Sequence, residues 1–295
     1  MKSPQSQATV LGQKPSWLKR RLPTDASYEN VRAMLQKDRL HTVCQEAKCP
    51  NIWECFAQQT ATFLILGSRC TRNCRFCSVD PGPLESPDPD EPVRVAEVAR
   101  QMRLKYVVVT SVTRDDLPDG GSGLFARTIV EIRKKIPEAC VEVLIPDFQG
   151  SAQALKTVLR AKPDVLNHNI ETVPRLYPLV RPGAHYRRSL ELIGRVRTLG
   201  FSMPTKSGLM LGLGEDAAEI KSVLGDLLQV KCRMLTIGQY LQPTKKHLAV
   251  KRYIPPAEFE KWRDIALEMG FFEVASGPFV RSSYHAKELF RAVKA

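Results

Sequence analysis

Three cysteines in residues 70–77 have the spacing of a cluster-binding loop. The segment SRCTRNCRFCSVD contains Cys70-x3-Cys74-x2-Cys77. Three thiolates on one short loop can ligate three corners of a cubane iron–sulfur cluster, which normally takes four cysteines. The missing ligand leaves one iron open, and a reacting site needs such an open position. Zinc is the alternative, but zinc motifs usually show paired Cys-x2-Cys knuckles with a fourth ligand.

A second group of three cysteines precedes the first. CQEAKCPNIWEC contains Cys44-x4-Cys49-x5-Cys55, again with no fourth cysteine nearby. Scattered structural cysteines are the alternative, but three so close together beside a cluster motif favour metal ligation. A second cluster would either pass electrons or act as a chemical reagent.

The amino-acid composition indicates which broad class of protein this is. The 295 residues are 43% hydrophobic and 25% charged, which is ordinary for a globular domain, and no apolar run is long enough for a membrane span. The basic lead-in of residues 1–24 lacks the apolar core of a signal peptide, so we expect a cytoplasmic protein. Clustered thiols in a reducing compartment indicate metal ligands, whereas the isolated Cys140 and Cys232 are interpreted as buried core thiols.

The net charge of +13 predicts an acidic partner. No RNA-binding signature accompanies this charge, so we expect no nucleic-acid partner. Because no apolar run is long enough for a membrane span, we also expect no membrane partner. Two basic segments are candidates for docking an acidic protein, with an ordinary solvated face as the alternative. The first segment contains Arg175, Arg181, Arg187 and Arg188, and the second contains Lys245, Lys246, His247, Lys251 and Arg252.

Strand-like and helical patterns alternate along most of the chain. The apolar runs predict six strands, at 62–66, 106–112, 141–145, 164–169, 208–213 and 234–240. Helical patterns cover 27–39, 93–103, 123–135, 151–160, 187–199, 215–229 and 256–269. This order implies parallel βαβ units, which fit either a doubly wound sheet or a barrel. Polar groups directly follow the apolar runs and favour the barrel, where working residues gather at the carboxyl ends of strands.

The Cys-x3-Cys-x2-Cys spacing resembles that of the radical S-adenosylmethionine superfamily. Members bind S-adenosylmethionine on the open iron and reduce it to a 5′-deoxyadenosyl radical that abstracts hydrogen. The two motifs in this order, with the C-terminal RSSY, resemble the lipoyl synthase family. The resemblance runs from about Trp17 to Ala286 and includes CPNIWECF, CTRNCRFC, NHNIETV, KSGLMLGLGE and GPFVRSSYHA.

The resemblance implies an α/β fold, a partial (β/α)6 TIM-like barrel with extensions at both ends. The N-terminal extension would be residues 1–60, the partial barrel of the radical S-adenosylmethionine fold would be residues 61–255, and the C-terminal extension would be residues 256–295. The implied reaction inserts sulfur at C6 and C8 of an octanoyl chain on a carrier lysine. The implied carriers are the E2 lipoyl domain of 2-oxoacid dehydrogenases and the glycine cleavage H protein. Ferredoxin or flavodoxin would supply electrons to a monomeric enzyme.

Two [4Fe-4S] clusters are implied. The Cys70, Cys74 and Cys77 cluster would cleave S-adenosylmethionine, and the Cys44, Cys49 and Cys55 cluster would donate sulfur and be dismantled. The resemblance assigns the fourth ligand of the donor cluster to Ser283. A serine oxygen is a harder ligand than a thiolate, so an iron held by it should leave more readily. Without the resemblance, Ser283 would be interpreted as a turn residue.

Polar residues near two strand ends are candidate contacts for S-adenosylmethionine. Thr110 and Ser111 end the second predicted strand, and Asn167, Asn169 and Glu171 follow the fourth. Helix capping is the alternative for these side chains. Asn167 and Asn169 share one face of a strand, so His168 should point the other way and pack. Phe76 lies directly before Cys77 and is the remaining candidate.

Two other functions are compatible with two clusters. An RNA methylthiotransferase would suit the basic charge, but no accessory RNA-binding domain is recognisable. An electron carrier or cluster scaffold would not need six βα units, and an iron left open suits catalysis better.

Overall fold

The computed structural model describes residues 14–19, 27–47, 49–57, 62–283 and 286. Most of the basic lead-in and Tyr284 of RSSY therefore lie outside the described residues. Within the described residues, no helix has both the length and the apolar character needed to cross a membrane.

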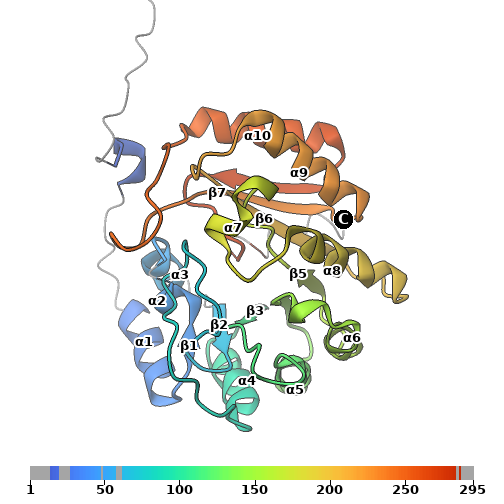
Figure 1. The fold of residues 1–295 in the computed structure, drawn as a ribbon. Coiled ribbons are helices and arrows are strands. Elements are labelled where there is room, and N and C mark those ends of the chain that lie inside the picture. The colour runs from blue at the N-terminus through green and yellow to red at the C-terminus, as the bar shows by residue number, and fades with distance from the viewer. Residues whose placement is uncertain (1–13, 20–26, 48, 58–61, 284–285, 287–295) are drawn as a thin grey trace, which may run out of the picture.

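One curved sheet forms the centre of the protein, and its eight strands are hydrogen-bonded in chain order (Figure 1). β1 pairs with β2 antiparallel, and all pairs from β2 to β8 are parallel. The strands are β1 (His41–Thr42), β2 (Thr62–Ile65), β3 (Tyr106–Ser111), β4 (Cys140–Leu144), β5 (Val165–Asn167), β6 (Thr205–Leu211), β7 (Met234–Gln239) and β8 (Glu273–Gly277).

Helices α4, α5, α6, α8, α9 and α10 lie in an arc outside the sheet, while α1 to α3 lie beside its β1 end (Figure 1). The α-helices are α1 (Ser27–Lys37), α2 (Val43–Glu46), α3 (Ile52–Ala57), α4 (Glu91–Gln101), α5 (Ser122–Lys135), α6 (Ala152–Arg160), α7 (Tyr177–Val180), α8 (Tyr186–Thr198), α9 (Ala217–Gln229) and α10 (Pro256–Met269). Short 3₁₀ turns cover Ser16–Leu18, Phe148–Gly150 and Pro174–Leu176.

The expected partial barrel is confirmed, and each of the six predicted strands is present. Strand β6 begins at Thr205, earlier than the predicted Gly208, because the buried Lys206 and Ser207 hide its start from an apolar pattern. β1 and β8 were not predicted. β8 is only five residues long and mostly half-buried. Its sequence, EVASG, contains no apolar run that would have predicted a strand. It pairs with β7 after α10 and so adds a further βα unit to the sheet.

The isolated cysteines have different environments. Cys232 is fully buried, as expected. The expectation for Cys140 is wrong, because it is only half-buried as the first residue of β4.

A polar network is buried inside the curve of the sheet. The Lys206 ammonium lies 3.0 Å and 3.2 Å from the two carboxylate oxygens of Glu142, and both side chains have zero exposure. Tyr106 donates to the same carboxylate at 2.6 Å, and the Asn167 amide donates to it at 2.9 Å. Four side chains from β3 to β6 thus share one buried charge pair, and each strand is held to its neighbours from the inside.

The C-terminal segment enters the same interior. A side chain at Gly238 on β7 would collide with the Val280 carbonyl, so the glycine is needed for this close approach. Ala286 is buried, and it packs in a cluster with Val108, Val165 and Met234. Val280 and Ala286, which follow β8 in the chain, therefore fill part of the barrel.

The buried charge pair generates a stability prediction. Glu142→Gln should lower the free energy of unfolding by about 3–5 kcal/mol, because it leaves the Lys206 charge buried without a counter-charge. The double variant Glu142→Gln/Lys206→Met should recover most of this loss. Urea unfolding of the cluster-free chain measures both effects.

Lys134→Ala provides the matched control. It breaks the exposed Lys134–Glu131 pair on α5 and should change stability by less than about 0.5 kcal/mol. A Glu142→Gln protein as stable as the parent would contradict the assignment of a charged buried pair.

Candidate functional site

The loop with Cys70, Cys74 and Cys77 follows β2 and is tied to the carboxyl end of β3. The Thr71 amide and hydroxyl both donate to the Thr113 carbonyl, at 3.0 Å and 2.9 Å. The backbone amides of Arg72 and Thr113 point at the Cys70 sulfur, at 3.4 Å and 3.3 Å. These two contacts fix the position of the Cys70 sulfur relative to the end of β3.

Arg72 holds this loop in place through hydrogen bonds to two aspartates. Its guanidinium bonds both carboxylate oxygens of Asp115, at 2.7 Å and 2.9 Å, and one oxygen of Asp147 at 2.6 Å. Burial opposes ionisation of Asp147, but the hydrogen bond and charge of Arg72 outweigh it and lower the pKa of Asp147 to about 2. The contribution of this pair to stability is therefore complete above about pH 4 and is lost as the pH falls toward 2. The sequence did not predict this role of Arg72, because no local pattern indicates that it pairs with Asp115 and Asp147.

The second half of the loop is held by the opposite side of the barrel. The Arg75 amide donates to the Val180 carbonyl at 2.9 Å, and a ring nitrogen of His247 lies 2.9 Å from the Cys77 carbonyl oxygen. Phe76 packs against the apolar cluster under α8 to α10. Burial raises the pKa of Cys77 to about 12 and also raises the pKa of Cys74. Ligation of these thiols must therefore release protons.

The candidate polar residues do not occupy equivalent positions. Thr110 donates its hydroxyl to the Leu144 carbonyl at 2.7 Å, which ties β3 to β4. Asn167 belongs to the buried network around Glu142. Asn169 lies nearer the carboxyl edge, where its amide nitrogen donates to Glu171 at 2.9 Å and to Ser282 at 2.5 Å.

His168 points away from Asn167 and Asn169, as predicted. Its ring nitrogens lie 2.8 Å from the Ile145 carbonyl oxygen and 2.9 Å from the Ser189 hydroxyl of α8. Burial lowers the pKa of His168 to about 4, so it packs as a neutral residue.

Arg181 lies inside the protein near the strand ends, and not on the surface as its basic segment predicted. Its basic segment was interpreted as a docking surface or an ordinary solvated face. Both interpretations are wrong for Arg181, because its guanidinium turns inward and donates to the Asn169 carbonyl at 2.8 Å and to the Tyr177 hydroxyl at 3.1 Å. Burial raises the pKa of the Glu171 carboxyl, although the Arg181 charge opposes that shift. Both charges also act on the Cys74 thiol, so they lie beside the cluster loop.

Three buried polar atoms at this edge have no hydrogen-bond partner among the described residues. They are the Ser111 hydroxyl, the Asn169 amide oxygen and the Arg181 Nε. Buried polar atoms normally have partners. A ligand rich in hydroxyl, amino and carboxylate groups, such as S-adenosylmethionine, would supply them, so these residues fit it.

The second cysteine group lies on two short helices. Cys44 is in α2, Cys55 is in α3, and the Cys49 amide between them donates to the Cys44 carbonyl at 3.1 Å. Burial raises the pKa of Cys44 well above its usual range, and the nearby Cys49 and Cys55 raise it further. The three thiols are therefore neighbours. The raised pKa of Cys44 makes its ligation a proton-releasing step.

A long-range contact brings the C-terminal segment to this second group. The Asn51 amide, between Cys49 and Cys55 in the chain, donates to the Phe279 carbonyl at 2.8 Å. Ser283 follows four residues later, in a half-buried turn. This contact places the C-terminal segment near the second group of cysteines.

The residue types of the two cysteine groups are those that hold iron–sulfur clusters. Across the part of the chain that is described, no three His, Cys, Asp or Glu side chains surround one common metal point. A cubane needs no common point, because each thiolate binds a different iron. Two groups of three thiols without a fourth cysteine thus fit two such clusters.

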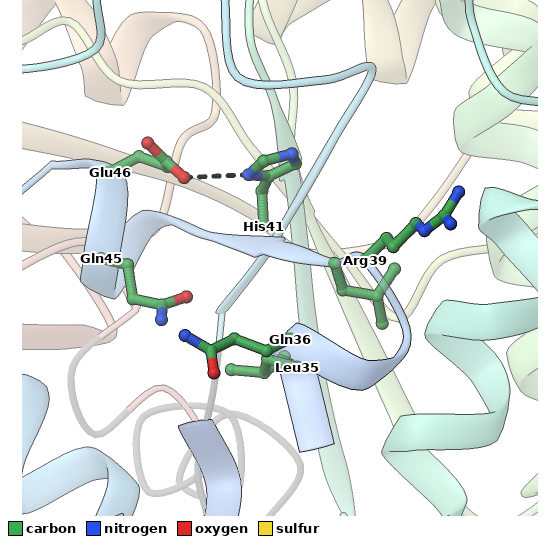
Figure 2. A pocket seen from close by; sticks show the side chains of 7 residues that line it. Leu35, Gln36, Arg39, His41, Gln45 and Glu46 are labelled. Atoms are coloured by element: carbon green, nitrogen blue, oxygen red, sulfur yellow. Dashed lines mark hydrogen bonds and ion pairs between the residues drawn. The ribbon is translucent and has the colours of Figure 1, made fainter. Parts of the chain in front are cut away.

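A pocket lies away from the strand ends, between α1 and α2 (Figure 2). Arg39, Gln36 and Gln45 line it, and His41 and Glu46 form a 2.9 Å pair at its edge (Figure 2). None of the six cluster-motif cysteines lines this pocket.

Comparison with known proteins gives the family. A family model described as "Radical SAM superfamily" matches residues 64–227, and "N-terminal domain of lipoyl synthase of Radical_SAM family" matches residues 3–49. The chain is 57% identical to a lipoyl synthase of Desulfotalea psychrophila, covering 94% of this chain and 93% of the relative. It is 55% identical to one of Caldanaerobacter subterraneus, covering 92% and 95%.

Solved structures agree on the fold alone. Streptococcus suis SuiB bound to S-adenosylmethionine superposes with a TM-score of 0.57 at 11% identity, over 76% of this chain and 53% of SuiB. Methylornithine synthase gives 0.51 at 13% identity, over 79% and 68%. Together, the relatives and the two family models show that the chain belongs to the lipoyl synthase family of radical SAM enzymes.

Proposed function

We propose that this enzyme inserts two sulfur atoms, at C6 and C8, into an octanoyl chain that is amide-linked to a lysine of a carrier protein. The observation that carries the proposal is the course of the C-terminal segment. It touches the second cysteine group through Asn51 and the strand-end site through Asn169. The names of the relatives favour this reaction over RNA methylthiolation.

Residues at the strand ends would form the radical-generating site. Cys70, Cys74 and Cys77 would hold a [4Fe-4S] cluster that supplies a hydrogen-abstracting radical from bound S-adenosylmethionine. Arg72 would keep the loop in place through Asp115 and Asp147. Ser111, Asn169, Glu171 and Arg181 offer the unpaired or charged polar groups for the rest of the ligand, with Thr110, Asn167 and Phe76 supporting the walls.

The second cluster would be the sulfur source. Cys44, Cys49 and Cys55 would hold it from the N-terminal extension, and Ser283 would be the fourth ligand from the C-terminal extension. A ligand drawn from the far end of the chain could leave without moving the three cysteines. Under this proposal, residues 1–60 and 256–295 are functional extensions of the barrel of residues 61–255.

An exposed basic loop next to the site suits an acidic carrier. Lys245, Lys246 and Lys251 are exposed, and His247 in the same loop contacts the Cys77 carbonyl. Octanoylated E2 lipoyl domains and the glycine cleavage H protein are the proposed carriers, with ferredoxin or flavodoxin as reductant. Cytoplasmic localisation and a monomeric state remain predictions.

Iron content tests the two-cluster assignment. The anaerobically reconstituted protein should bind about eight iron atoms and eight sulfides per chain. Cys74→Ala and Cys49→Ala should each retain about four, because each removes one ligand of a different cluster. Cys232→Ala, which alters a buried thiol outside both groups, should retain about eight. One or two zinc ions in place of iron would overturn the assignment.

Ser283→Cys tests the role of the serine ligand. A thiolate should hold the exchanged iron more firmly, so sulfur insertion into an octanoyl-lysine peptide should fall at least tenfold, while about eight irons remain bound. The assay contains S-adenosylmethionine and a reductant, and mass spectrometry follows the gain of sulfur. Ser276→Cys on β8 places a thiol in the same extension and should leave insertion unchanged. Full turnover by Ser283→Cys would count against Ser283 as the releasable ligand.

A further inference from the structure

The C-terminal segment makes a side-chain contact to the strand-end site that no cluster ligand explains. Ser282 Oγ accepts a hydrogen bond from the Asn169 amide at 2.5 Å, across 113 residues of sequence. Ser282 directly precedes Ser283, so one short segment reaches both sites.

The contact fixes the orientation of the Asn169 amide. Its nitrogen has two hydrogens, and both are used, by Glu171 at 2.9 Å and by Ser282. The reverse orientation would turn the amide oxygen toward the acceptor oxygens of Glu171 and is disfavoured. The amide oxygen is therefore presented on the other side, where it is buried and the described part of the chain offers it no hydrogen-bond partner.

The space around that oxygen is kept open by a glycine. A side chain on Gly208 of β6 would approach the Asn169 oxygen to 2.8 Å, which is too close. An acceptor that is oriented, buried and unpaired suits a donor group of a bound ligand, such as a hydroxyl or an amino group.

The backbone around Ser282 is also confined. The Val280 amide donates to the Gly277 carbonyl at 3.1 Å, and the Val280 carbonyl lies against Gly238. The Asn51 amide holds the neighbouring Phe279 carbonyl. A shift of Ser282 would therefore move a segment that is attached to both sites.

We propose that Ser282 is a positioning residue that orients Asn169 for S-adenosylmethionine and couples filling of that site to the order of the segment carrying Ser283. The inference rests on the proposed function and extends it to a residue next to the proposed cluster ligand. Coupling between two sites is reciprocal, so the ligand should order the segment and the segment should strengthen ligand binding.

Ser282→Ala tests the orientation step. Loss of one hydrogen bond should weaken equilibrium binding of S-adenosylmethionine about fivefold in the reconstituted protein, while iron content stays at the parent value. Ser282→Thr keeps the hydroxyl and should restore binding. Ser276→Ala is the matched control, because its hydroxyl bonds the Phe259 carbonyl away from the site, and it should bind like the parent.

A double-variant cycle separates positioning from a general structural role. If Ser282 acts through Asn169, Ser282→Ala should cause no further loss of affinity in an Asn169→Ala background. Additive losses would overturn the proposal, and so would parent-like binding by Ser282→Ala. If Ser282→Ala loses iron, the cycle is run with Ser282→Thr and Ser282→Gly, and equal affinities of those two variants would also overturn it.

Hydrogen–deuterium exchange tests the coupling step without turnover. S-adenosylmethionine should slow exchange in residues 278–283 of the parent, and this response should disappear in Ser282→Ala. An unchanged response in Ser282→Ala would reject the coupling. Failure of the parent to add sulfur to the octanoyl-lysine peptide would refute the proposed function, whereas these binding and exchange results judge Ser282 alone.

Discussion

The parallel pairing of β2 to β8 in chain order is the constraint on which the site depends. Every one of these strands ends at the same edge of the sheet, so the segments that follow them must meet there. The Cys70 loop follows β2, Thr113 follows β3, and Asn169 follows β5. Their mutual contacts arise because the sheet delivers them to one edge, although they are far apart in the chain.

Polar groups inside the curved sheet differ in how completely they are hydrogen-bonded. The buried Glu142 carboxylate is paired with Lys206 and accepts hydrogen bonds from Tyr106 and from the Asn167 amide nitrogen, as a buried charge requires. The Asn167 amide oxygen has no hydrogen-bond partner among the described residues. Nearer the edge, the Ser111 hydroxyl and the Asn169 oxygen are buried and have no hydrogen-bond partner among the described residues. A polar group left without a partner is costly. A bound ligand that supplied the partner would offset this cost.

The C-terminal segment makes contacts near both cysteine groups. Asn51 holds Phe279 beside the second cysteine group, and Ser282 holds Asn169 beside the first. Only a few residues separate the two contacts, so a displacement of the segment at one contact would also move it at the other.

The sequence by itself determined the two cysteine groups, the alternation of strands and helices, and the opposite directions of His168 and its asparagine neighbours. These are local properties, since ligand spacing and strand periodicity involve residues close together in the chain. Only the tertiary structure decided that Arg181 turns inward, that Asn167 and Asn169 have different partners, and that β8 extends the sheet. Each of these depends on contacts between distant residues, such as the 228-residue separation of Asn51 and Phe279, and no local pattern encodes such a contact.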